Sequence, residues 1–177
     1  MSETATNASY DPQAAAQRPY DSRRPQELVR QFHQVYNLPI ESVETPECDR
    51  ERIHMRMSLI AEEYAELTGA LYGKQAREII EGAQAQALAA DDHTRDTVEV
   101  ADALADLVYV IYGMALECGI DLDAVLHEVQ ASNLSKLGAD GKPIYREDGK
   151  VLKGPGFFSP DIAAVLARRE PHRPAAQ

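Results

Sequence analysis

The sequence of 177 residues has no tryptophan, only two cysteines and no long uninterrupted apolar segment. Cys48 and Cys118 stand alone rather than in a CxxC pair, so neither a disulfide framework nor a zinc site is predicted. Cys118 falls in an apolar helical segment and is expected in the core. Because no apolar run approaches membrane-spanning length and the N-terminus lacks a hydrophobic signal core, we expect a cytoplasmic protein without a membrane partner.

Basic residues are scarce in the middle of the chain. Between Ile60 and Gln130 there are 15 Asp or Glu residues and 3 Lys or Arg residues, and the formal net charge of the whole chain is −11. Such a surface repels a nucleic-acid backbone, so nucleic acid is not an expected partner. An acidic segment suits cations, and it suits an anionic substrate only if cations accompany the substrate.

Common nucleotide-binding and catalytic motifs are also missing. The segment 138–143 lacks the spacing and the Ser or Thr of a Walker loop, and there is no GxSxG or GxGxxG. The 5 histidines are scattered, and only residues 51–54 match the Glu-x-x-His pattern. A di-iron bundle needs two such pairs, so that class of protein is set aside.

Helical periodicity dominates the rest of the chain and predicts an all-α bundle of four to five helices. Residues 1–22 and 169–177 are expected to be tails around one domain, 23–168. A small β-hairpin is predicted at 144–152, where two short apolar segments flank Asp148 and Gly149. The expected helices cover 25–36, 48–73, 74–90, 95–118 and 122–136, with a short one at 160–168.

Two groups of carboxylates lie within these helices. Glu63 and Glu66 share one helix face because residues three apart do so, and Glu62 lies one step round. Either the acids form solvated helix faces or they bind a hard divalent cation such as Mg²⁺. The second group favours the cation, because it interrupts a strongly apolar helix where unpaired acids are costly. That group shares a face and comprises Asp102, Asp106 and, one turn nearer the N-terminus, Glu99.

Two further pairs are candidates with an ordinary alternative. Arg52 and Arg56 stand one turn apart before the first acidic group, as a solvated face or as a phosphate contact. Asn133 and Lys136 share a face at the end of the 122–136 helix, where they can hold a ribose or a phosphate. The alternative for Lys136 is ordinary capping of a helix C-terminus, which the helix dipole favours.

In this order, the elements resemble the all-α nucleoside triphosphate pyrophosphohydrolases of the MazG and phosphoribosyl-ATP pyrophosphohydrolase type, including the dimeric dUTPase-like branch. The resemblance extends over about 28–166. The segments that carry it are Leu59–Glu66, Ala103–Gly113, Gly119–Asp121, Glu128, Ser132–Lys136, Asp148–Lys150 and Lys153–Gly154, with Phe32–His33 in the first helix.

The resemblance implies Mg²⁺-dependent cleavage between the α and β phosphates of a nucleoside triphosphate, with Mn²⁺ as a substitute cation. It implies metal ligation by Glu63, Glu66 and Asp106, and it places Glu62 as the residue that orients or activates water. Lys136 and Lys153 are candidates to stabilise the departing pyrophosphate. Substrate contacts also include Asn133, and candidate base contacts are Tyr109, His33, Phe157 and Phe158.

The chain departs from the family pattern at Ala103, where the family has a metal-binding Glu. On a helix, Asp102 lies roughly 6 Å along the axis from Asp106, and Glu99 roughly 10.5 Å. We therefore expect Asp102 to replace the missing ligand and Glu99 to be a second site or an outer-shell residue.

The resemblance and the many-sided apolar 95–118 helix together indicate a homodimer or homotetramer. Two other functions stay open at this point. One is a nucleotide-binding or sensing module that has lost catalysis through the Ala103 change. The other is a structural helical dimer with acidic surfaces. Neither the preferred base nor the sugar is predicted.

Overall fold

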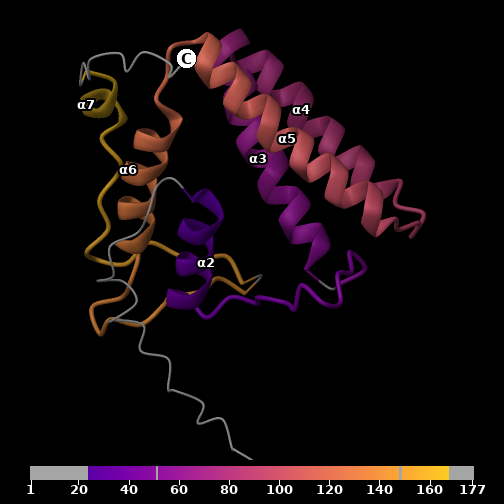
Figure 1. Cartoon of the computed structure of the whole chain (residues 1–177), viewed down its shortest axis with the longest axis horizontal. Coiled ribbons are helices and arrows are strands. Elements are labelled where there is room, and N and C mark those ends of the chain that lie inside the picture. The colour runs from indigo at the N-terminus through magenta and orange to yellow at the C-terminus, as the bar shows by residue number, and fades with distance from the viewer. Residues whose placement is uncertain (1–23, 51, 148, 168–177) are drawn as a thin grey trace, which may run out of the picture. The chain divides into compact units, whose positions relative to one another are not determined.

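The computed structural model describes residues 24–50, 52–147 and 149–167, and all the regular structure in these ranges is helical (Figure 1). The predicted all-α fold is therefore confirmed. The predicted tails at 1–22 and 169–177 lie outside the described residues. The helices are α2 (Pro25–Val35), α3 (Ile53–Tyr72), α4 (Lys74–Ala89), α5 (Thr97–Glu117), α6 (Leu122–Leu134) and α7 (Ile162–Ala167).

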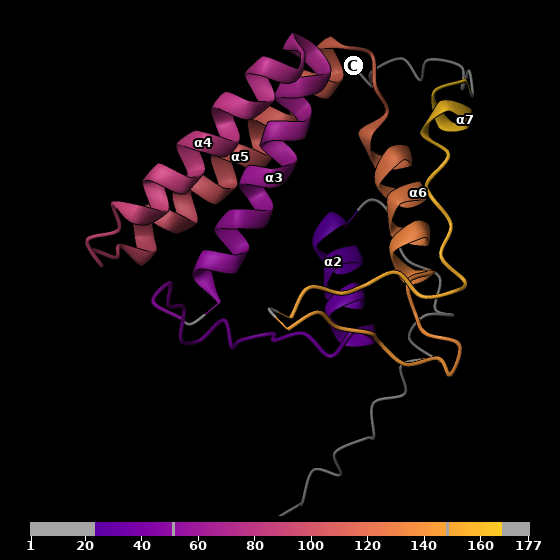
Figure 2. The same cartoon turned by 180° about the vertical axis from the view of Figure 1, so that it is seen from behind.

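The chain divides into two compact units, which are described separately. Unit 2 covers 41–108 and contains α3, α4 and the first half of α5. Its main packing is between α3 and α4, which run side by side in both views (Figures 1 and 2). Gly73 joins them with a φ of 92°, a conformation that glycine adopts without steric cost. The small side chains of Ala65 and Thr68 are buried on α3 and permit the close approach.

Unit 1 covers 1–40 and 109–177 and contains α2, the end of α5, α6 and α7. Its core is centred on Val35 and Tyr36 at the end of α2, which are 1% and 0% exposed. Gln130 of α6 fastens this helix to α2, because its side-chain amide donates to the backbone oxygen of Leu28 at 2.9 Å. Partly buried apolar residues packed on this core are Phe32, Leu38, Leu134, Leu137 and Val151.

The predicted β-hairpin at 144–152 is not supported. A single antiparallel bridge joins Tyr145 to Val151, and the described residues of this segment form no strand. The backbone N–H of Leu152 donates to Ile144 O at 2.8 Å, so the chain reverses direction without building a ladder. Two segments of about three residues are too short for a stable sheet, since an isolated hairpin is marginal in water.

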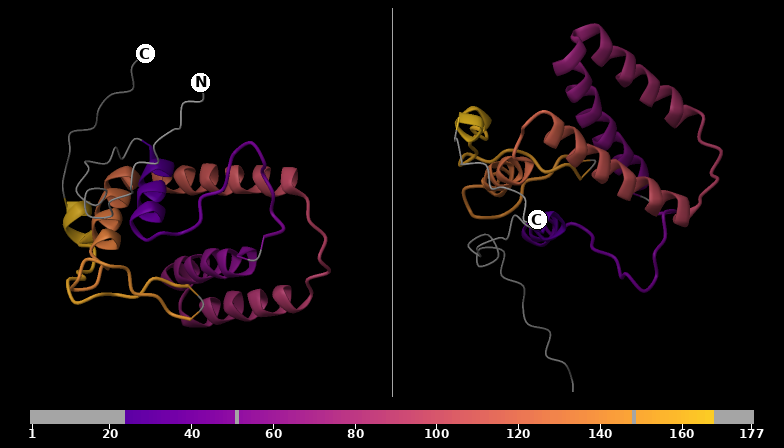
Figure 3. Two further views of the ribbon diagram at one scale, coloured as in Figure 1. Left: turned by 90° about the horizontal axis from the view of Figure 1, so that it is seen from below. Right: turned by 45° about the horizontal axis from the view of Figure 1, so that its top comes forward.

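α5 differs most from the sequence-based expectation. A helix that is apolar on many sides is normally buried on several of them, yet only Ala115 is buried among the residues of α5. Every residue from 101 to 110 is exposed, and Tyr109 is 82% exposed. Cys118, which was expected in the core, is also exposed. α5 is one continuous helix (Figure 3), so the exposure is not caused by a break in it.

None of the described helices alone is long and apolar enough to cross a bilayer. α5 and α6 satisfy the criteria of length and composition only when taken together, with a sharp bend at the break between them.

Candidate functional site

The first acidic group lies on α3 in the register that the sequence predicted. Glu62, Glu63 and Glu66 are all exposed. Arg77 of α4 approaches this group and lies 3.5 Å from Glu66, while it donates to Glu81 at 2.7 Å. The pKa of Arg77 is raised by the Glu81 hydrogen bond first, and also by the charges of Glu66 and Glu62. A fixed cation from α4 thus offsets part of the repulsion among the acids on α3.

The second acidic group lies on the first half of α5. Glu99, Asp102 and Asp106 are exposed there, and the latter two share a face at the i, i+4 spacing. Asp96 caps this helix, because its carboxylate accepts from Val98 N at 2.9 Å and Glu99 N at 3.1 Å. The cap fixes where α5 begins and hence the turn on which each acid stands.

The two acidic groups do not converge within one chain. Among the described residues, no three His, Cys, Asp or Glu side chains lie close enough to hold a metal ion. The packing partner of α3 in unit 2 is α4. The donor chemistry suits Mg²⁺, which prefers carboxylate oxygens, but the arrangement in a single chain does not provide the shared ligand set that was predicted.

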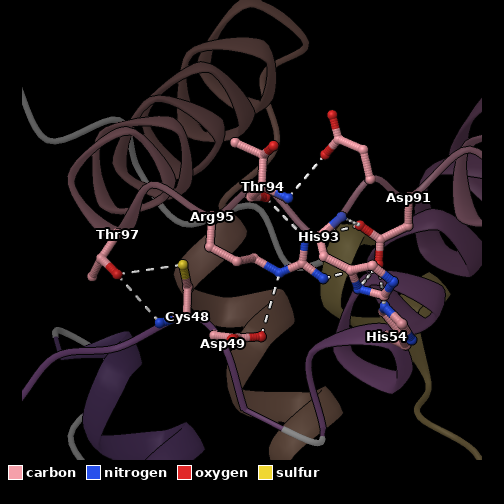
Figure 4. A network of polar contacts seen from close by, with 9 residues as sticks. Cys48, Asp49, His54, Asp91, His93, Thr94, Arg95 and Thr97 are labelled. Carbon is pink, nitrogen blue, oxygen red and sulfur yellow. Dashed lines mark hydrogen bonds and ion pairs between the residues drawn. The ribbon is translucent and has the colours of Figure 1, made fainter.

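A polar network that sequence reasoning missed fixes the ends of α3 and α5 in unit 2 (Figure 4). Asp91 is at its centre: its carboxylate accepts from Arg95 at 2.8 and 2.9 Å and from His54 of α3 at 3.0 Å. The Arg95 hydrogen bonds, followed by those from His93 N and His54, hold the pKa of Asp91 far below its ordinary value. In the sequence, the adjacent acids Asp91 and Asp92 are typical of a helix break and cap, but they do not reveal this network.

The same network extends to the segment before α3. Arg95 Nε lies 3.8 Å from Asp49, and Thr97 accepts from the backbone N–H of Cys48 at 3.3 Å (Figure 4). Segment 48–49, the start of α3 and the start of α5 are therefore joined by side chains that come from all three. This orders the end of unit 2 at which α3 begins.

Three predicted substrate-binding residues come together in unit 1. Lys136 donates to the side-chain oxygen of Asn133 at 2.7 Å, and the buried Tyr36 hydroxyl donates to Asn133 O at 2.8 Å. The backbone N–H of Gly154 donates to Lys136 O at 3.0 Å, which brings Lys153 to the same end of α6. Lys153 places its ammonium 4.3 Å from the centre of the Phe157 ring. Asn133 and Lys136 are thus paired, and the backbone next to Lys153 lies against Lys136.

Two other predicted contacts lie elsewhere in unit 1. Tyr109 stands on the exposed part of α5 and is not part of the Asn133 group. His33 donates from Nδ1 to Pro39 O at 2.9 Å and lines a cavity of about 200 Å³. The other lining residues are Gln26, Val29, Arg30, Pro39 and Ile40.

Comparisons with known proteins agree with the arrangement of these helices. The model of the phosphoribosyl-ATP pyrophosphohydrolase family matches residues 29–133. A crystal structure of a proposed NTP pyrophosphohydrolase from Exiguobacterium sp. 255-15 is similar at 30% sequence identity and a TM-score of 0.60. The similarity covers 80% of this chain and 93% of that one. A comparison with curated proteins found no match. The family match spans both acidic groups and α6 as far as Asn133, and the chain therefore belongs to the phosphoribosyl-ATP pyrophosphohydrolase family of hydrolases.

Proposed function

We propose that this chain is a cytoplasmic, Mg²⁺-dependent pyrophosphohydrolase that cleaves a nucleoside triphosphate into its monophosphate and pyrophosphate. The observation that supports it best is the position of the two acidic groups, each on an exposed helix face beside an exposed apolar stripe. The stripe on α3 consists of Met57, Ile60, Tyr64, Leu67 and Leu71. The stripe on α5 consists of Val100, Leu104, Leu107, Ile111 and Met114.

Helix geometry relates the acids to these stripes. At about 100° per residue, each stripe lies roughly a third of a turn round its helix from the acids, in the same rotational sense on α3 and α5. Two such helices that pack antiparallel through their stripes bring their acids to the same side. Parallel packing would put the acids on opposite sides. Burial of the two stripes against each other in an antiparallel pair would therefore bring the carboxylates together.

A homodimer is the proposed means of covering these stripes. Ten consecutive residues of α5, from 101 to 110, are exposed, and Leu116 beyond them is 78% exposed. A monomer rarely leaves so much contiguous apolar surface in water, and exposure on this scale is typical of an interface. A second copy of the chain supplies a matching apolar surface by symmetry. A homotetramer would cover exposed apolar surface on a second face of each chain in the same way.

In this proposal Glu63, Glu66, Asp102 and Asp106 hold Mg²⁺, with Glu99 as an additional or outer ligand. The cation would neutralise the triphosphate and polarise its oxygens. Glu62 orients a water and accepts its proton as the oxygen attacks the α-phosphorus. The bond from that phosphorus to the α–β bridging oxygen breaks, and pyrophosphate leaves with the electron pair. Lys136 and Lys153, with Asn133, offset the charge of the phosphates.

The cavity beside His33 is the proposed position of the base. It is lined by apolar Val29 and Ile40 and by the polar side chains of Gln26, Arg30 and His33. Because His33 donates from Nδ1 to Pro39 O, its ring is held in one orientation at the wall of the cavity. A ring of defined orientation between apolar walls suits a planar base, although this does not distinguish one base from another.

The decisive experiment incubates the protein with a panel of ribo- and deoxyribonucleoside triphosphates and Mg²⁺, and analyses the products by ³¹P NMR. We expect monophosphate and pyrophosphate in equal amounts. Release of orthophosphate and a diphosphate would contradict the α–β cleavage. Parallel melting curves should show that millimolar Mg²⁺ raises the melting temperature, because a ligand that binds only the folded state stabilises it. An unchanged melting temperature would contradict the metal site.

A nucleotide-binding or sensing dimer is the second candidate, favoured by one observation. Ala103 stands on the exposed face of α5 where the resembling family has a metal-binding Glu. If that change removed catalysis, nucleotides would still raise the melting temperature but no pyrophosphate would appear. Turnover of any triphosphate in the panel would exclude this alternative.

A further inference from the structure

Two arginines lie at the beginning of α3, where the helix dipole favours acidic residues. Arg52 is the N-cap residue of α3, and Arg56 lies one turn later, with its N–H donating to Arg52 O at 3.0 Å. The first turn of α3 has no acidic residue, and no side chain caps it. The N-terminal end of a helix carries a partial positive charge, so two cations there destabilise it. An anion at this position would reverse that effect.

The burial of Arg52 does not fit a solvated face. Its Nε and Nη2 atoms are shielded from solvent and have no hydrogen-bond partner among the residues that the structure describes. Arg56 is half-buried beside it, and burial first, then the charge of Arg52, lower the pKa of Arg56. Buried donors are nearly always paired, and each unpaired one costs free energy. These atoms are therefore in place for an acceptor from outside the described residues.

Nearby acids of unit 2 are already engaged by other cations. Arg50 lies 3.6 Å from Glu41 and 3.7 Å from Glu47. Arg95 holds Asp91, whose other oxygen accepts from His54 (Figure 4). Glu41, Glu47 and Asp91 thus have partners of their own. Arg52 Nε and Nη2 are therefore left for an acceptor other than these three acids.

The position of the pair relates it to the acidic group on α3. At about 100° per residue, Arg52, Arg56 and Glu63 lie within roughly 40° of one another on the helix wheel. Arg56 precedes Glu63 by seven residues, which is about 10.5 Å along the axis. The face that carries the acids is therefore continued toward the N-terminus by two guanidinium groups.

We propose that Arg52 and Arg56 form a phosphate-binding subsite that receives the pyrophosphate end of the nucleotide. Guanidinium groups bind phosphate oxygens through paired, charge-assisted hydrogen bonds, which matches the unpaired Nε and Nη2 of Arg52. The inference rests on the proposed function for the identity of the nucleotide. Binding of the free anion can be tested without it.

The test uses inorganic pyrophosphate as the probe, in the presence of EDTA so that no divalent cation contributes. Isothermal titration calorimetry compares the wild type with R52Q/R56Q, R52K/R56K and the matched control Lys74→Gln. Lys74 is on α4, 88% exposed and paired with Glu78 at 3.4 Å, so it tests the loss of a general surface charge. We expect the Gln double variant to lose about tenfold or more in affinity, equivalent to 1.4 kcal/mol or more. The Lys double variant should be intermediate and the control unchanged.

Circular dichroism and sedimentation velocity verify that each variant is folded and report its oligomeric state. If the Gln double variant is unfolded, the Lys double variant and single variants at each position carry the comparison. Equal affinity in the wild type and the folded arginine variants overturns the proposal, as does absence of pyrophosphate binding to the wild type. Dissociation of the oligomer with unchanged pyrophosphate affinity also overturns it, because the arginines then serve an interface.

Kinetics separate failure of this inference from failure of the proposed function. With an active wild type, loss of the subsite should raise KM for the triphosphate and weaken product inhibition by pyrophosphate. Turnover with KM and inhibition unaffected by the arginines contradicts the subsite and leaves the function standing. Arginine-dependent pyrophosphate binding without turnover of any triphosphate contradicts the function and supports the subsite.

Discussion

Two regions are predicted to contact the nucleotide: the end of α6 in unit 1, and the acidic faces of α3 and α5 in unit 2. Contacts within the chain order the first region more than the second. At the end of α6, Asn133 and Lys136 hydrogen-bond to each other and the backbone of both is held by other residues. On α3 and α5, the acids stand on exposed faces and do not converge in the described residues. The difference has a physical cause.

Neutral and cationic donors find acceptor oxygens of the backbone and of side chains within their own chain, so hydrogen bonds alone order them. Carboxylates are acceptors only and repel one another, so they cannot order each other without a cation. The neighbouring apolar stripes likewise need a covering surface, which the described part of the chain does not provide. We infer that unit 1 presents a preorganised substrate contact, whereas the acidic site depends on metal and on a second copy.

The largest expected effect, a loss of turnover, comes from a substitution in the acidic group on α3. Glu63→Gln keeps the shape of the side chain and removes a ligand charge, so turnover should fall about 10²- to 10³-fold with the fold intact. Steady-state assay and melting curves measure both. Glu78→Gln on α4, an equally exposed helix acid, is the control and should retain activity. Normal turnover in Glu63→Gln would remove this residue from the site.

The second prediction concerns a substitution that disrupts the ordered region at the end of α6 in unit 1. A Cβ on Gly154 would lie 1.9 Å from Leu137 O and 2.5 Å from Leu137 C, a contact that only backbone movement can relieve. Gly154→Ala should lower the free energy of unfolding by about 2–4 kcal/mol and displace Lys153. Gly156→Ala is the matched control, because its nearest neighbour would be Ser135 O at 4.0 Å, and it should change stability by less than about 1 kcal/mol. Urea unfolding distinguishes them, and equal stability of the two variants would contradict the clash.

The same comparison explains what could be predicted from the sequence. Periodicity located the helices closely: α2 was expected at 25–36 and lies at Pro25–Val35, and the Gly73 break between α3 and α4 is observed. These features depend on local spacing, which one chain fully specifies. The association of Asn133 with Lys136 was also predictable, because it lies within one helical turn.

The failures have a different origin. The sequence indicated both burial of α5 and a homodimer but could not show how much of the helix its own chain leaves exposed, because an apolar helix has the same sequence whether its own chain or another copy covers it. The hairpin was wrong because turn chemistry at Gly149 predicts a reversal without showing whether a ladder forms. The Asp91 network joins residues as far apart as His54 and Arg95, and no short-range pattern indicates such a contact.

A third prediction sharpens the comparison by testing the register of the acids on α5. Asp102 lies about 6 Å along the axis from Asp106, whereas Glu99 lies about 10.5 Å away, and two ligands of one Mg²⁺ must lie close together. Asp102→Asn should therefore reduce turnover and weaken Mg²⁺ dependence about 10- to 100-fold, and Glu99→Gln by less. Titration of activity against Mg²⁺ concentration measures both effects.

Restoration of the family residue is the matching gain-of-function test. Ala103→Glu in the Asp102→Asn background should recover part of the activity, since it returns a carboxylate to the turn of α5 that holds Asp106. A silent Asp102→Asn combined with an inactive Glu99→Gln would reverse the assignment and make Glu99 a primary ligand.

The smallest expected effect concerns Tyr36, whose buried side chain supports the end of α6. It is 0% exposed, and its hydroxyl donates to Asn133 O at 2.8 Å and Leu134 O at 3.2 Å. Tyr36→Phe should lower the free energy of unfolding by about 1 kcal/mol at pH 7.

The pH dependence gives a sharper readout, because burial raises the pKa of Tyr36 from 10.0 to about 12. Below pH 10 the hydroxyl is protonated in both states, so the advantage of the wild type over the variant is constant. Between pH 10 and 12 the unfolded chain releases this proton while the folded chain retains it, so the wild type loses stability that the variant does not lose. The stability of the wild type relative to the variant should therefore fall by about 1–3 kcal/mol over that range, which is enough to abolish or reverse its advantage. Other tyrosines and lysines titrate in both proteins and cancel. Urea unfolding at pH 7, 10, 11 and 12 measures the difference, and a constant gap would show that Tyr36 is not held protonated by burial.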